Sequence, residues 1–115
     1  MSATVYGYIR SEGDDRHEED RVHDQLSGYA AAEGLGLSDV FVDRHMPPAR
    51  LMRPGLTALL DAIRRTDGCT VLVASLDHLS SSVPVRQAIE AEITDAGGQL
   101  LELAASDTRP AAPRS

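Results

Sequence analysis

The segment Val5-Tyr6-Gly7-Tyr8-Ile9-Arg10-Ser11-Glu12 is the part of the chain around which we expect the rest to be organised. Its first residues are mostly β-branched or aromatic, as is typical of a buried strand. It ends in an arginine, a hydroxyl and a carboxylate. Because an open α/β sheet presents its chemistry beyond the carboxyl ends of its strands, the segment predicts a strand over 4–9 that leads into a functional site.

The rest of the chain alternates between helical and extended patterns. Apolar residues recur at helical spacing over 18–33, 54–63 and 84–93, and strand-like runs cover 37–43, 70–74 and 99–104. Strands joined through helical crossovers are parallel. The order therefore predicts an α/β fold, a small, mostly parallel four-stranded sheet with helices on both faces. We expect one domain over 1–107 and a flexible C-terminal tail over 108–115.

Composition narrows the classes of protein to consider. The chain has 115 residues, a net charge of −7 and a single cysteine, Cys69. It has no apolar run long enough for a membrane span and no signal-peptide pattern, so we expect a cytoplasmic protein without membrane contact. Cys69 is expected to be a small core residue. The negative charge opposes binding to a polyanion, so contact with nucleic acid would require a local basic patch.

Five short motifs occur along the chain, and they are Tyr8-Ile9-Arg10, Gln25-Leu26 with Gly34, Phe41-Val42-Asp43, Arg53-Pro54-Gly55-Leu56 and Leu76-Asp77-His78-Leu79-Ser80. In this order and spacing they resemble the catalytic domain of the serine recombinases, the resolvase and invertase family. The resemblance covers residues 4–107.

The resemblance implies a domain that, in active relatives, cuts DNA with a serine hydroxyl and then rejoins the strands. The family pattern at the first strand is Tyr-x-Arg-x-Ser, so Arg10 is retained and Glu12 takes the place of the nucleophile. In the family's Leu-Asp-Arg-Leu-x-Arg motif, Asp77 is retained, but His78 and Ser81 replace the two arginines. A carboxylate facing a phosphate diester adds repulsion where the reaction needs positive charge. We therefore expect a catalytically inactive domain that acts as a regulatory or protein-interaction module.

Ser11 supports an alternative, an active site-specific recombinase or strand-cleaving domain that uses this hydroxyl as its nucleophile. Ser11 lies one residue before the expected position. Neighbouring side chains of an extended strand point to opposite faces, so Ser11 is expected to face away from the site unless a bulge or the following loop turns it. Its reaction would also require replacements for the missing arginines.

The retained residues Arg10, Asp43, Arg53 and Asp77 leave two interpretations open. They form either a vestigial phosphate or DNA surface, or a structural cluster of ion pairs at the strand ends.

His17, Asp20, His23 and Asp24 are of residue types that can bind a metal. The two histidines are six residues apart and do not share a helix face, so we expect solvated helix surface and no metal. The chain has no glycine-rich phosphate loop, and no cofactor is expected. Ser82 is expected to cap the helix that follows it.

The partner classes also follow from the resemblance. Family members usually continue into a dimerisation helix and a DNA-binding domain, whereas this chain stops at Ser115. We expect a protein partner or a second copy of the chain. DNA is implied by the resemblance but disfavoured by the charge.

Overall fold

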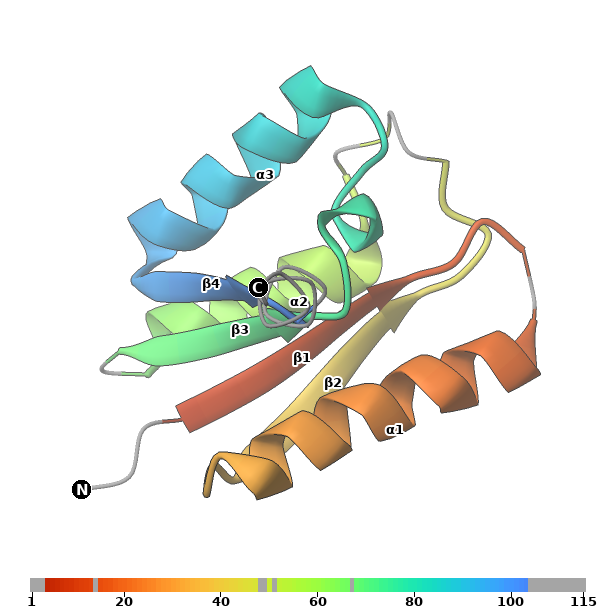
Figure 1. Cartoon of the computed structure of the whole chain (residues 1–115). Coiled ribbons are helices and arrows are strands. Elements are labelled where there is room, and N and C mark those ends of the chain that lie inside the picture. Colours follow the sequence, from red (N-terminus) through yellow and green to blue (C-terminus); the bar gives the residue numbers. More distant parts are fainter. Residues whose placement is uncertain (1–3, 14, 48–49, 51, 67, 104–115) are drawn as a thin grey trace, which may run out of the picture.

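The sheet is four-stranded and entirely parallel, with strand order β2-β1-β3-β4. The computed structural model describes residues 4–13, 15–47, 50, 52–66 and 68–103. The predicted α/β class and the helices on both faces are confirmed (Figure 1). The elements, in chain order, are β1 (Thr4–Arg10), α1 (Arg16–Ala32), β2 (Leu37–Asp43), α2 (Pro54–Arg64), β3 (Cys69–Val73), the 3-10 helix η1 (Leu76–His78), α3 (Val83–Ala96) and β4 (Gly98–Glu102).

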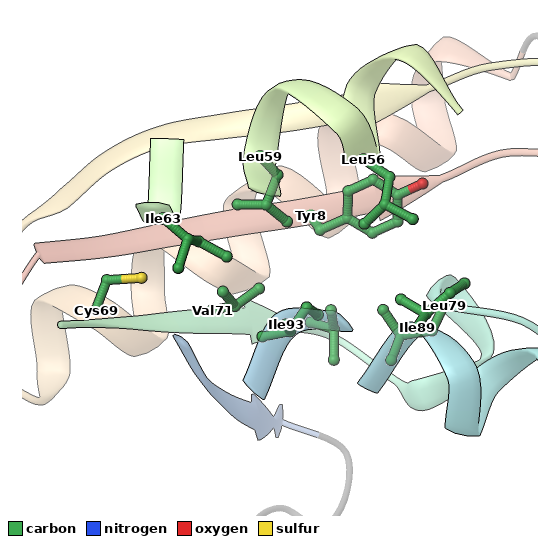
Figure 2. Packing of buried hydrophobic residues seen from close by; sticks show 10 residues of the cluster. Tyr8, Leu56, Leu59, Ile63, Cys69, Val71, Leu79, Ile89 and Ile93 are labelled. Carbon is green, nitrogen blue, oxygen red and sulfur yellow. The ribbon is translucent and has the colours of Figure 1, made fainter. Parts of the chain in front are cut away.

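Alternation along β1 divides the core into two layers. Val5 and Ile9 pack with α1, whereas Tyr8 packs with α2 and α3 on the opposite face. Figure 2 shows the second layer, in which Leu59 and Ile63 of α2 approach the sheet. Both side chains are fully buried, and each contributes about 1.5–3 kcal/mol to folding. This packing holds β1 rigidly in the middle of the molecule.

Local sequence explains where most helices begin and end. Helix α1 begins at Arg16, two residues before the predicted start, because the Asp15 side chain accepts a hydrogen bond from the Glu18 N–H at 3.1 Å. Helix α2 begins with Pro54, as expected. Helix α3 ends at Gly97, whose φ of 109° is the left-handed conformation that glycine adopts without strain.

The predicted cap of α3 by Ser82 is wrong. Ser82 occupies the N-cap position, but its side chain makes no capping hydrogen bond. The Ser82 N–H instead donates to the buried Ser80 Oγ at 2.9 Å. The side-chain acceptor in this turn is therefore Ser80 and not Ser82.

Several expectations concern the chain as a whole. Cys69 is buried, as predicted. Within the described ranges, no helix is long and apolar enough to cross a membrane. The predicted boundary at residue 107 and the tail over 108–115 lie outside the described residues.

Candidate functional site at the carboxyl edge of the sheet

The carboxyl ends of the strands meet at one edge of the sheet, and Arg10 is the centre of the contacts there. Its side chain is 6% exposed. Nε and Nη2 donate to the main-chain carbonyl of Asp77 at 3.3 and 2.8 Å. Nη1 donates to the Met46 carbonyl and to Glu12 Oε2, both at 3.1 Å. Arg10 thus joins three segments of the chain, and Asp77 takes part through its backbone.

His78 is bonded to the end of the same strand. Its Nδ1 accepts the Arg10 backbone N–H at 3.1 Å. Burial lowers the pKa of His78 and the Arg10 charge lowers it further, while the carboxylates of Glu18 and Asp77 oppose the shift. The imidazole is therefore neutral at pH 7, and the hydrogen bond assigns its proton to Nε2. A position that the family resemblance gives to an arginine carries no positive charge here.

Ser11 and Glu12 follow the last residue of β1. The Ser11 N–H donates to the Asp43 carbonyl at 2.8 Å, which continues the sheet ladder for one residue. The Ser11 hydroxyl donates to the Gly13 carbonyl in its own loop at 3.1 Å. Among the described residues, no histidine or carboxylate accepts the Ser11 hydroxyl proton, so no general base activates it.

A cavity of about 220 Å³ opens at this point, between the end of β1 and the start of α1. Its lining residues are Ile9, Arg10, Ser11, Glu12, Glu18, Glu19, Val22 and His78. Ser11 and Glu12 line the same cavity, although strand alternation predicted opposite directions. Alternation ends with β1 at Arg10, and the chain bends at Glu12.

The charges around this cavity are largely paired. Glu19 is buried and lies 2.8 Å from Arg44 Nε. Glu18 pairs with Arg21 on the exposed surface of α1. With three carboxylates and a single guanidinium in its lining, the cavity offers little net attraction to a phosphate.

A second group of retained residues is fully enclosed. Asp43 is 4% exposed. Its carboxylate accepts the N–H groups of Gly55 at 2.7 Å and Leu56 at 2.9 Å, together with the Tyr8 hydroxyl at 2.8 Å. Asp43 therefore satisfies the free N–H groups at the start of α2.

Arg53 completes this group from the residue before α2. It is 1% exposed, and its Nη1 donates to the Tyr8 hydroxyl at 3.3 Å. Figure 2 shows that hydroxyl reaching the end of the sheet beside Leu56. Burial is the largest cause that raises the Tyr8 pKa, so the phenol stays protonated and donates to Asp43.

The predicted site residues thus fall into two groups, with Ser11 and Ser81 outside both. The first group, the Arg10 cluster, comprises Arg10, Glu12, Asp77, His78 and the Met46 carbonyl. The second group, the Asp43 network, comprises Tyr8, Asp43, Arg53 and the N–H groups of Gly55 and Leu56. Ser81 is exposed and lines no part of the cavity.

Two participants were missed by the sequence analysis. Tyr8 was named as part of a family motif but given no role in the site, although a tyrosine on the core face of a strand needs a partner for its hydroxyl. Glu19 was not considered as a site residue. Its spacing from Val22 and Leu26 places it on the buried face of α1, and that spacing was the signal for its pairing with Arg44.

The histidine-rich part of α1 shows no metal-binding arrangement. In the described part of the chain, no group of three histidine, cysteine or acidic side chains is placed to hold an ion. His17 and His23 are both exposed.

Comparison with known proteins gives consistent results. The sequence profile of the family described as "Resolvase, N terminal domain" matches residues 5–114. The chain is similar to the N-terminal catalytic domain of TP901-1 integrase, with 32% identity over 90% of this chain and 78% of that one and a TM-score of 0.77. No curated protein matches the sequence significantly.

Two further solved structures share the fold at lower identity. The C-terminal catalytic domain of ISC1926 TnpA, an IS607-like serine recombinase, has 24% identity over 87% of this chain and 67% of that one, with a TM-score of 0.73. A serine recombinase from Sulfolobus solfataricus has 19% identity over 89% of this chain and 69% of that one, with a TM-score of 0.59.

Proposed function

This chain belongs to the resolvase N-terminal domain family and has the fold of a serine recombinase catalytic domain, and from this premise we propose that it no longer cleaves DNA. It acts instead as a regulatory or protein-interaction module, with a protein partner or a second copy of itself. The observation that carries the proposal is the contact between Glu12 and Arg10. Glu12 stands where the resemblance places the nucleophile, and its carboxylate holds the arginine of the same motif at 3.1 Å.

Electrostatics argues against cleavage at this site. Transfer of a phosphoryl group needs positive charge around the phosphate as negative charge spreads over its oxygens. Two like charges about 4 Å apart repel by about 1 kcal/mol in water and about 4 kcal/mol in a partly buried site. The Glu12 carboxylate would impose such a cost. The neutral His78 does not offset it.

The alternative, cleavage by Ser11, has one favourable observation. Ser11 lines the same cavity as Arg10. Its hydroxyl, however, donates to a carbonyl of its own loop and lacks a base among the described residues. A serine hydroxyl at its ordinary pKa is a weak nucleophile without such activation.

A plasmid assay separates the two functions. Supercoiled DNA is incubated with the wild type, with Ser11→Ala and with the triple variant Glu12→Ser, His78→Arg, Ser81→Arg, which restores the family residues as a sensitivity control. We expect the wild type and Ser11→Ala to leave the plasmid equally supercoiled. Relaxation by the wild type that Ser11→Ala abolishes would establish the alternative function.

Binding is measured separately. The net charge of −7 predicts no submicromolar, salt-sensitive shift of duplex DNA in a gel. Such a shift would count against the interaction module. Light scattering across protein concentrations tests the homodimer. The proposal also places the domain in the cytoplasm, where its single thiol, Cys69, would remain reduced.

A further inference from the structure

The hydrogen bonds of Arg10 are not all of the same kind. A guanidinium has five N–H groups. Three of those on Arg10 donate to main-chain carbonyls, those of Asp77 and Met46, and a fourth donates to the Glu12 side chain. The fifth, on Nη2, donates to no group in the described part of the chain. The Arg10 side chain, which is 6% exposed, thus keeps one N–H without an acceptor among the described residues.

The Glu12 contact is the replaceable one. The Glu12 side chain is 62% exposed, so its carboxylate can move into solvent at small energetic cost. The carbonyls of Asp77 and Met46 are main-chain groups, which can move away only together with the backbone of their segments. If Glu12 moved away, Arg10 would offer one N–H on each of its two terminal nitrogens, a fork that matches the oxygens of a phosphate.

We propose that the Glu12 carboxylate is an autoinhibitory anion, which occupies Arg10 and keeps a phosphate group out of the cavity. The inference rests on the proposed function, because it takes Glu12 as the residue that replaced the nucleophile. Arg10 supplies the charge, and His78, which lines the same cavity, supplies a neutral imidazole. The ligand class is a phosphate group, either free or in a nucleic-acid backbone.

The same cavity provides a matched control. Glu18 also lines it and carries the same charge, but it pairs with Arg21 and makes no hydrogen bond to Arg10. Glu12→Gln and Glu18→Gln therefore raise the net charge of the protein by one unit each. Only the first removes the anion in contact with Arg10.

The experiment titrates inorganic phosphate, and in a separate arm a short duplex oligonucleotide, into the wild type and both variants. Binding is followed through the NMR signal of the Arg10 Nε–H, after circular dichroism has shown that each variant is folded. We expect Glu12→Gln to bind phosphate roughly tenfold more tightly than the wild type, whereas Glu18→Gln stays within about twofold. A gain with phosphate alone identifies a free phosphate as the ligand, and a gain in both arms extends the site to nucleic-acid phosphates.

Two results would overturn the inference. An equal increase in phosphate affinity in Glu12→Gln and Glu18→Gln would mean that only the net charge of the protein matters. An Arg10 signal that responds no more in Glu12→Gln than in the wild type would mean that Glu12 does not compete for the site. Neither result depends on cleavage. Plasmid relaxation by the wild type would defeat the proposed function without altering this titration.

Discussion

Two buried arginines at retained positions, Arg10 and Arg53, lie at the same edge of the sheet in opposite situations. Arg53 is 1% exposed and belongs to the Asp43 network, which is closed in the sense that its side chains, those of Tyr8, Asp43 and Arg53, are all buried. Arg10 is almost as buried but borders a cavity, and one of its contacts is to an exposed carboxylate. The closed network consists of groups that hold β1, β2 and α2 together. The Arg10 cluster, bordering the cavity, contains all the replaced residues except Ser81.

The difference indicates which family residues serve the fold and which serve the chemistry. The Asp43 carboxylate accepts three hydrogen bonds, and loss of any member leaves buried polar groups without partners. Glu12 and His78 can replace a serine and an arginine at little cost to folding, because they lie beside a cavity. A domain that lost cleavage would therefore keep the first group and change the second.

The largest expected effect is on the closed network. Asp43→Ala removes the acceptor for Gly55, Leu56 and the Tyr8 hydroxyl, so the free energy of unfolding should fall by about 3–5 kcal/mol. Urea denaturation measures the change. Asp39→Ala is the matched control on the same strand, since Asp39 is exposed and accepts, among the described residues, only the Val40 N–H. It should cost less than about 1 kcal/mol. Similar losses in both variants would remove the distinction between the regions.

Two glycines, one beside the Asp43 network and one in α1, provide a second test of how tightly that network is packed. A Cβ at Gly55 would lie 2.9 Å from the Asp43 carboxylate, so Gly55→Ala should destabilise the protein by about 1–3 kcal/mol. Gly28 lies in α1 with no atom near its missing side chain. Gly28→Ala should therefore stabilise the protein by about 0.5–1 kcal/mol. Thermal or urea unfolding of both variants tests the opposite signs, and a neutral Gly55→Ala would show that Asp43 can move.

His78 gives a smaller effect that depends on pH. Its folded pKa is lowered from 6.5 by burial and by Arg10, with Glu18 and Asp77 opposing. Above pH 6.5, the contribution of His78 to the free energy of unfolding is fully present. As pH falls through 6.5, the unfolded chain takes up a proton that folded His78 resists, so this contribution is lost on acidification.

His78→Asn removes this dependence while leaving an oxygen that can accept the Arg10 N–H. Between about pH 7.5 and about pH 5, the variant should lose less stability than the wild type. His23→Asn, at an exposed position on α1, serves as the control and should follow the wild type. A His78→Asn curve parallel to the wild-type curve would mean that folded His78 takes up its proton as readily as the unfolded chain does.

Much of the fold could be predicted because local signals and packing agree. The apolar run over 70–74 and the prolines at the starts of α2 and α3 each specify an element on their own, and the structure places them within a residue or two. The 3-10 helix η1 was not predicted. It is a single turn fixed by the Ser75 cap and by contacts of Arg10, which come from distant parts of the chain.

For the site, the sequence predicted which residues take part but not how they are arranged. Motif spacing identified Arg10, Asp43, Arg53 and Asp77, but not their division into two groups. That division depends on where β1 stops and on the Asp77 carbonyl, which no side-chain pattern encodes. Strand alternation could not give the direction of Ser11, because Ser11 lies beyond the last residue of β1, in the loop that was expected to be able to turn it.

The central claim, that the domain does not cleave DNA, is tested most directly by the mass of the protein after incubation with nicked duplex substrates that trap covalent intermediates. We predict that the wild type gains no mass, while the triple variant with restored family residues reports the sensitivity of the assay. A DNA adduct on the peptide that contains Ser11, absent from Ser11→Ala, would contradict the account.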